Sequence, residues 1–304
     1  MKPVVSRAVL FAVCLLAPAM ALPGAEDQPT AVYGRGAHAL AVATGSPGEL
    51  GLLEALAEPF SKAHDTIVHW YKAGSGESLA LLKERKVDVA LVHSPEAERR
   101  AVAQGWAARR TPIGSNEFYL VGPKNDPARV AGAKSMAEAY ARIANAEAPF
   151  YSRGDGSGTH KREMAIWERA GVRPEGAWYR VCGDFMLATL AAANRENAYF
   201  MTDSSTWVAA RAELGNLRLL FQGDPLMRNA YHGLCRPEEA GRPRSLAAGF
   251  LDFVASQEGQ AIVRDYGKDR YGEALYRDAR SVLAVGAEAP CVDHGPLDQG
   301  ENMR

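Results

Sequence analysis

The chain has 304 residues, which is enough for one large domain or two of medium size. Hydrophobic residues make up 47% and charged residues 23%, as is typical of a soluble globular protein with a substantial core. The formal net charge of -1 excludes the broad basic surface with which proteins hold nucleic acids or anionic membranes. An anionic ligand therefore requires a local binding site.

The N-terminal residues have the pattern of an export signal. Lys2 and Arg7 form a positive start, residues 8–16 form an apolar run, and Ala19-Met20-Ala21 provides an A-x-A cleavage pattern. We therefore expect a signal peptide over residues 1–21, cleavage near Leu22 and a periplasmic mature protein. The alternative is an N-terminal membrane anchor.

Short apolar runs alternate with amphipathic segments, a pattern that predicts parallel α/β organisation after a flexible lead-in over residues 22–36. Strands are predicted over 38–44, 67–71, 87–92 and 118–121, with helices over 50–60, 77–85 and from 95. A second unit has strands over 149–152, 178–181, 199–202 and 217–221, with helices over 135–145, from 158, over 185–194 and from 204. A returning strand over 230–235 and helices over 246–255 and 259–266 follow.

Two α/β units in series, with a late segment that returns to the first, predict two lobes around a cleft. We expect residues 37–121 and 232–270 to form the first lobe and residues 122–231 to form the second. Residues 271–304 are expected to be a C-terminal tail without a readable function.

The most informative motif is the glycine-rich segment that runs from Tyr151 to His160. It follows a predicted strand and opens a predicted helix, where backbone N–H groups and the helix dipole can hold an anion. Arg153 adds a planar double donor, Ser157 and Thr159 add hydroxyls, and Asp155 either orients Arg153 or caps the helix. The alternative is a surface turn with an ordinary cap.

Two further turns, Thr44-Gly45-Ser46 and Gly74-Ser75-Gly76, also follow strands and precede helices. Ligands of open α/β sheets bind outside the carboxyl ends of the strands, so the three turns can face one cleft. The alternative is that helix caps alone account for these serines and glycines.

The sequence does not favour a P-loop, a catalytic nucleophile or a metal site. The lysine after His160 is misplaced for a phosphate-binding P-loop, and no nucleophile elbow has credible partners, so no enzyme activity is expected. Cys182, Cys235 and Cys291 allow at most one disulfide in the mature chain, with its pairing open, and their spacing does not suit a metal site. No cofactor is expected.

Three blocks carry a family resemblance: Ala90 to Glu98, Asn116 to Pro123, and Ser152 to Lys161. Together with the segments 178–179, 188–190 and 198–203, they resemble the periplasmic tungstate-binding proteins of ABC transporters, and the third block also resembles phosphate-binding proteins. The similarity runs from about Leu40 to Cys235. At the first turn, the proteins of this family usually have a run of threonines and a serine, whereas this chain has the sequence from Ala43 to Pro47. Only Thr44 and Ser46 therefore match the family pattern at this turn.

The resemblance implies a type II periplasmic-binding-protein fold, with two α/β lobes joined by two crossover strands and an oxyanion in the cleft. The expected contacts with the oxyanion come from six residues in two turns and from Ser75: Thr44, Ser46, Arg153, Ser157, Gly158 and Thr159, with Asp155 and His160 behind them. The implied partner is an ABC permease, and we expect a monomer. The open alternatives are a phosphate or molybdate binder and an extracytoplasmic anion sensor.

Overall fold

The computed structural model describes residues 28–238 and 245–286. The expected signal peptide, Cys291 and the last part of the expected tail lie outside the described residues. The strands are β1 (Ala31–Tyr33), β2 (His38–Thr44), β3 (Thr66–Lys72), β4 (Val89–Val92), β5 (Ala108–Pro123), β6 (Phe150–Ser152), β7 (Tyr179–Val181), β8 (Tyr199–Asp203), β9 (Leu217–Phe221), β10 (Arg228–Cys235) and β11 (Arg277–Asp278). They join in one hydrogen-bonded path, β1-β3-β2-β4-β10-β5-β8-β6-β7, with β9 and β11 also paired to β5.

The helices alternate with the strands, as the sequence predicts. They are α1 (Ser46–Glu49), α2 (Leu52–His64), α3 (Ser75–Lys83), α4 (Pro95–Ala103), α5 (Met136–Asn145), α6 (Gly158–Arg169), α7 (Met186–Arg195), α8 (Ser204–Ala210), α9 (Leu246–Ala255), α10 (Gln257–Asp265), α11 (Lys268–Tyr271) and α12 (Ala279–Gly286). Within the described ranges, no helix combines the length and apolar character needed to cross a membrane.

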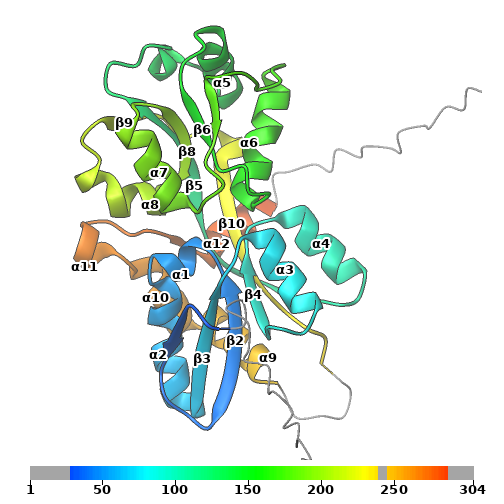
Figure 1. Ribbon diagram of the computed structural model, residues 1–304. Helices are drawn as coiled ribbons and strands as arrows, with labels where there is room; N and C mark the ends of the chain where they lie inside the picture. Colours follow the sequence, from blue (N-terminus) through cyan, green and yellow to red (C-terminus); the bar gives the residue numbers. More distant parts are fainter. Residues whose placement is uncertain (1–27, 239–244, 287–304) are drawn as a thin grey trace, which may run out of the picture.

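Figure 1 shows two lobes, with β1–β4, α1–α4, α9 and α10 in the lower one and α5–α8 around β6, β8 and β9 in the upper one. Each lobe has its own apolar core, one built around Phe60 and Phe250 and the other around Tyr140, Phe150 and Trp167. Parallel pairing of β2 with β3 and β4, and of β6 with β7 and β8, directs the carboxyl ends of these strands toward the space between the lobes. The mixed α/β fold expected from the sequence is confirmed.

β5 and β10 cross from one lobe to the other and pair with each other in antiparallel register (Figure 1). The predicted strand over 118–121 is too short, because β5 begins ten residues earlier at Ala108. Pro112 lies beside a register shift in the ladder, where its missing N–H donor is tolerated. Both lobe boundaries inferred from the sequence, after residues 121 and 231, fall inside these strands, and the position of the hinge stays a prediction.

Two expectations for the ends of the described chain were wrong. The lead-in over 22–36 contains β1, which pairs with β3. Residues beyond 270 belong to the first lobe, because Leu275 and Tyr276 are buried in its core and β11 pairs with β5. Local patterns do not reveal this, because the pairing partners of both segments lie far away in the sequence.

The helix predicted over 50–60 begins at Leu52 as α2, and a break at Gly51 separates it from α1. This glycine has a φ of 88°, in the left-handed region that a side chain disfavours. A Cβ at Gly51 would also lie 2.4 Å from the Tyr266 hydroxyl, which donates to the Leu50 carbonyl at 2.6 Å. The break leaves α1 as a single turn directly after β2.

Candidate functional site

The turn between β6 and α6 is closed by its own polar groups. Gly154 and Gly156 both have positive φ, which lets the chain double back before the helix. The N–H of Gly154 donates to Ser152 Oγ at 3.1 Å, and the N–H of Gly156 donates to His160 Nδ1 at 2.9 Å. Ser157 caps α6, because its hydroxyl accepts the His160 N–H at 3.3 Å. The His160 ring therefore helps to hold this turn closed.

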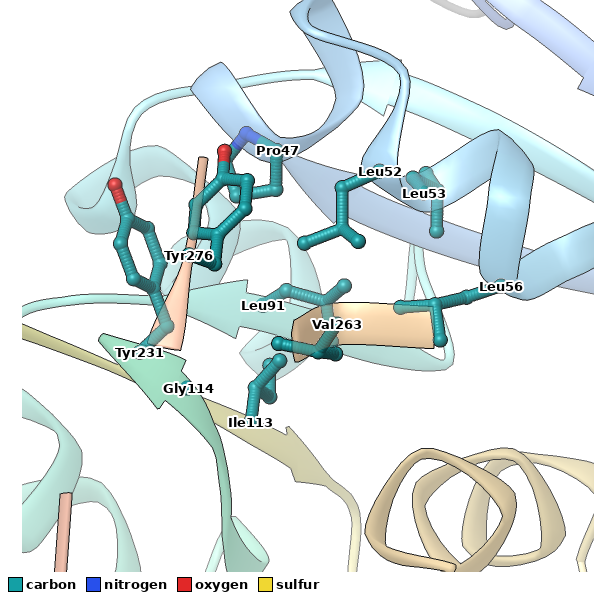
Figure 2. A pocket seen from close by; sticks show the side chains of 10 residues that line it. All are labelled: Pro47, Leu52, Leu53, Leu56, Leu91, Ile113, Gly114, Tyr231, Val263 and Tyr276. Carbon is teal, nitrogen blue, oxygen red and sulfur yellow. The ribbon is translucent and has the colours of Figure 1, made fainter. Parts of the chain in front are cut away.

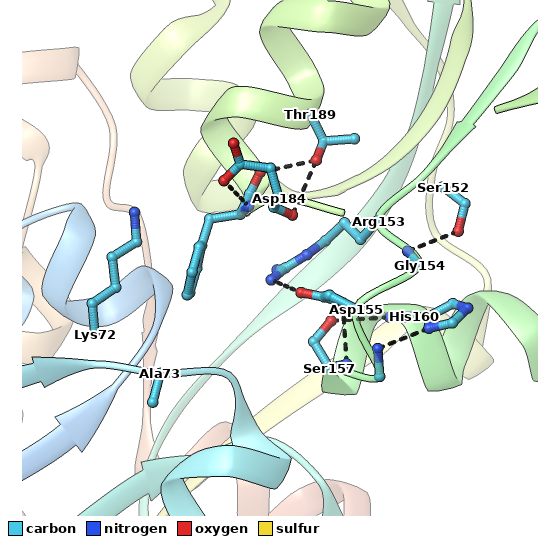
Figure 3. A network of polar contacts seen from close by, with 12 residues as sticks. Lys72, Ala73, Ser152, Arg153, Gly154, Asp155, Ser157, His160, Asp184 and Thr189 are labelled. Carbon is cyan, nitrogen blue, oxygen red and sulfur yellow. Dashed lines mark hydrogen bonds and ion pairs between the residues drawn. The ribbon is translucent and has the colours of Figure 1, made fainter. Parts of the chain in front are cut away.

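Arg153 lies buried in this turn and forms an ion pair with Asp155 (Figure 3). The other carboxylate oxygen of Asp155 accepts the Ser157 N–H at 3.1 Å. Burial works against ionisation of Asp155, but hydrogen bonds from Ser157 and the charge of Arg153 outweigh it and hold the pKa below its ordinary value. Asp155 is thus an ionised carboxylate that leans back onto its own turn.

Two donors of the turn are buried and unpartnered. Among the described residues, Arg153 Nε and Thr159 Oγ1 have no hydrogen-bond partner. The N–H groups of Gly158 and Thr159, in the first turn of α6, also have no acceptor within the helix. This end of α6 therefore presents hydrogen-bond donors and the positive end of the helix dipole to one place.

The two first-lobe turns, after β2 and after β3, differ in how many hydrogen-bond donors they leave free, although the sequence predicts similar roles for both. The Thr44 hydroxyl is fully buried and donates to the Leu91 carbonyl at 3.0 Å, so it holds β2 to β4 and has no proton free for an anion. Ser75 accepts the backbone N–H of His93 at 3.1 Å, which leaves its own O–H proton available. Ser46 is partly exposed at the start of α1. Neither α1 nor α3 has a side-chain cap. The first N–H groups of α3 therefore remain unpaired by a cap, whereas in α1 the N–H groups of residues 48 and 49 already donate to the carbonyl of residue 45.

The starts of α3 and α6 face each other across the cleft. A Cβ added at Gly74 would lie 3.5 Å from Ser157 Cβ. A Cβ at Gly158 would lie 2.8 Å from the His93 ring, so only glycine leaves room for this contact between the lobes. Burial lowers the pKa of His93 despite its hydrogen bond with Asn229, so the ring is neutral at pH 7.

Sequence reasoning missed two residues of the cleft, Lys72 and Phe185. Lys72 is the last residue of β3 and Phe185 directly precedes α7. The Lys72 ammonium lies 4.2 Å from the centroid of the Phe185 ring. The Arg153 guanidinium carbon lies 5.4 Å from the same centroid. Figure 3 shows Lys72 and Ala73 on the opposite side of the cleft from Arg153. Lys72 lies at the end of a strand and Phe185 at the end of a loop, which are positions where binding residues often lie. The sequence contains no local pattern that would predict contact between the two side chains.

An apolar cavity in the first lobe is a poor alternative site (Figure 2). Its volume is about 10 Å³, the space of about one water molecule. Its lining is mostly leucine, isoleucine, valine and tyrosine, from Pro47 to Tyr276. It lacks the converging donors that an oxyanion requires. Within the described part of the chain, no group of three or more metal-ligating side chains is present.

Comparisons with known proteins identify the family of this chain. Residues 25–258 match a family model described as a PBP superfamily domain. The tungstate-binding protein TupA of Peptoclostridium acidaminophilum is 32% identical over 278 residues, covering 88% of this chain and 96% of the relative. TupA of Campylobacter jejuni is 30% identical over 227 residues, covering 73% of this chain and 84% of the relative.

Solved structures give the same result. The tungstate ABC transporter protein of Geobacter sulfurreducens is 36% identical with a TM-score of 0.67, covering 76% of this chain and 100% of that chain. TupA of Desulfovibrio alaskensis G20 is 33% identical with a TM-score of 0.66, covering 80% and 99%. The chain therefore belongs to the PBP superfamily and, within it, to the family of the tungstate-binding protein TupA.

Proposed function

We propose that this chain is the extracytoplasmic receptor of an ABC importer and binds a tetrahedral oxyanion, tungstate, in the cleft between the lobes. The observation that carries the proposal is the pair of buried, unpartnered donors at the start of α6, Arg153 Nε and Thr159 Oγ1. A buried donor without a partner costs about 1–3 kcal/mol, which an oxyanion that accepts from both donors would offset. The dipole of α6 favours a negative charge at the same place.

The proposed ligand set follows from the geometry of the turns. Arg153, Ser157, Gly158 and Thr159 supply donors from the second lobe, with Asp155 and His160 holding them in place. From the first lobe, Ser75 and Ser46 supply hydroxyls and the start of α3 supplies N–H groups. Thr44 supports its turn through Leu91 and does not donate its hydroxyl to the ligand.

The orientation of Asp155 favours tungstate over phosphate. Tungstate at neutral pH is a fully deprotonated dianion that only accepts hydrogen bonds, whereas phosphate still carries a proton that needs an acceptor. Each oxygen of Asp155 already accepts one hydrogen bond inside its own turn, from Arg153 and from the Ser157 N–H, and these bonds hold the carboxylate against the turn; we propose that it does not accept the phosphate proton. Phosphate then buries an unmatched O–H, at a cost of about 1–3 kcal/mol.

The TupA relatives support tungstate as the ligand and a transport role, in which the protein binds its ligand without a catalytic step. We extend this to export through a signal peptide over residues 1–21, a periplasmic location, a permease partner and a monomeric state. Each is consistent with a receptor that must meet its ligand outside the cytoplasm.

Isothermal titration calorimetry of the purified protein tests the proposal with tungstate, molybdate, sulfate and phosphate at pH 7.5. We expect tungstate to bind most tightly and phosphate at least about tenfold more weakly, which corresponds to ~1.4 kcal/mol. Tighter phosphate binding that strengthens as the pH falls would replace tungstate by phosphate and place Asp155 in the pocket. If none of the four anions binds, the receptor function is wrong.

A further inference from the structure

Lys72 connects the two first-lobe turns of the cleft. It is the last residue of β3, directly before the turn that leads into α3. Its ammonium pairs at 2.7 Å with Glu49, the last residue of α1. The side chains are only 28% and 14% exposed, so water and salt screen this pair less than a pair on the open surface. Lys72 thus carries a positive charge at a defined place in the first lobe.

The Phe185 ring, which belongs to the second lobe, contacts the charged end of Lys72. The Lys72 ammonium lies 4.2 Å from the ring centroid and the Arg153 guanidinium carbon lies 5.4 Å from it. Both distances suit attraction between a cation and the face of an aromatic ring. The two cations, one from each lobe, are therefore within about 10 Å of each other, close to the screening length of ~8 Å in physiological salt.

This arrangement has an electrostatic consequence. Two like charges repel as the lobes approach; pairing with Glu49 and Asp155 weakens that repulsion, and the Phe185 ring offsets a further part of it. An anion held by Arg153 attracts Lys72 in proportion to its own charge. The attraction between Lys72 and a bound dianion is therefore about twice as strong, in free energy, as its attraction to a monoanion of the same shape.

We propose that Lys72 and Phe185 form a charge gate that makes the cleft prefer doubly charged over singly charged tetrahedral oxyanions. Lys72 supplies the charge, Phe185 holds it across the cleft, and Glu49 sets its strength by partly neutralising it. This inference rests on the proposed function, because it concerns the same bound anion. Lys72 and Phe185 act here as positioning residues that select for anion charge.

Tungstate and perrhenate separate charge from shape, because both are tetrahedral oxyanions and they carry charges of −2 and −1. The dissociation constants of both are measured for the wild type, K72M and E49Q. In K72M we expect tungstate to bind about tenfold and perrhenate about threefold more weakly, so the preference for the dianion falls about threefold. In E49Q the preference should rise, because the ammonium loses its neutralising partner.

K83M is the matched control. Lys83 lies 5.6 Å from the ring of Trp106, a cation–aromatic contact within the first lobe and away from the cleft. This variant should leave the ratio of the two dissociation constants unchanged. F185L should lower the preference for the dianion in the wild type and have little further effect in K72M, because the two side chains act as one unit.

The outcomes distinguish the two levels of the proposal. If the wild type binds tungstate but K72M and E49Q leave the tungstate-to-perrhenate ratio unchanged, the gate is wrong and the oxyanion receptor stands. If the wild type binds neither anion, both proposals fail. Thermal melting of each variant shows whether a loss of binding comes from unfolding, and E49Q keeps the test decisive because its predicted effect is a gain.

Discussion

Arg153 and Asp155 form an ion pair within the proposed binding site. Asp155 accepts from the guanidinium and from the Ser157 N–H, which fixes the arginine side chain and satisfies part of its charge. Arg153 Nε stays buried without a partner among the described residues. The guanidinium is therefore held in place in advance while part of its hydrogen-bonding capacity remains for an anion.

Replacing Arg153 with alanine should weaken tungstate binding about ten- to a hundredfold, since a charge-assisted hydrogen bond contributes about 1.5–3 kcal/mol. Titration calorimetry measures the effect. R180A is a suitable control, because Arg180 also lies in the second lobe but pairs with Glu196 on an exposed surface. An unchanged affinity in folded R153A would remove Arg153 from the binding site.

Helix α6 joins the proposed site to the core of the second lobe. Thr159, Glu163 and Trp167 are spaced by four residues, so they share one buried face of the helix. Glu163 accepts from the Trp167 indole N–H at 3.2 Å and from the Tyr179 hydroxyl at 2.8 Å. Burial outweighs these hydrogen bonds and raises the pKa of Glu163 to about 7.

This raised pKa predicts a stability that depends on pH. The folded state binds the proton of Glu163 more tightly than the unfolded state, whose pKa is near 4.5. The stabilisation from the protonated Glu163 side chain is therefore fully present below about pH 4.5 and is lost as the pH rises through about 7. The loss lowers the free energy of unfolding by about 3 kcal/mol.

Chemical denaturation of the wild type and E163Q between pH 4.5 and 8 measures this change. Glutamine resembles the protonated acid and keeps an oxygen for the Trp167 and Tyr179 donors. E163Q should therefore lack this part of the pH dependence. The free energy of unfolding of E163Q minus that of the wild type should be larger at pH 8 than at pH 4.5. Parallel curves for the two proteins would contradict the assignment.

At the scale of the whole molecule, the two lobes are joined by β5 and β10 and meet at the starts of α3 and α6. Near this meeting point, Lys72 and Arg153 bring two positive charges to one aromatic ring. We expect their repulsion, weakened by the carboxylate paired with each, to disfavour closure without an anion, and we propose that a bound anion accepts hydrogen bonds from both lobes. Ligand binding and closure of the cleft are therefore expected to be coupled.

Small-angle X-ray scattering tests this coupling. Saturating tungstate should reduce the radius of gyration of the wild type, because the lobes approach each other. R153A at the same tungstate concentration should show a smaller decrease or none. Identical wild-type curves with and without tungstate, under conditions where calorimetry shows binding, would mean that the cleft is already closed in solution.

Local patterns in the sequence were sufficient for much of the fold. The predicted strands over 38–44 and 217–221 and the helix over 246–255 coincide with β2, β9 and α9, because hydrophobic period and helix caps act over a few residues. The glycine-rich motif was likewise placed correctly between β6 and α6, since positive φ and capping are local requirements.

Only the tertiary structure decided which side chains meet. The first part of β5 is a strand because it pairs with β10, more than a hundred residues later, and its own composition does not predict this. The Thr44 hydroxyl is occupied by Leu91, and Asp155 turns toward Arg153, one of two arrangements that the sequence left open. Contacts between distant segments depend on how the two lobes pack, so the residues that carry the chemistry could be proposed from the sequence while their partners could not.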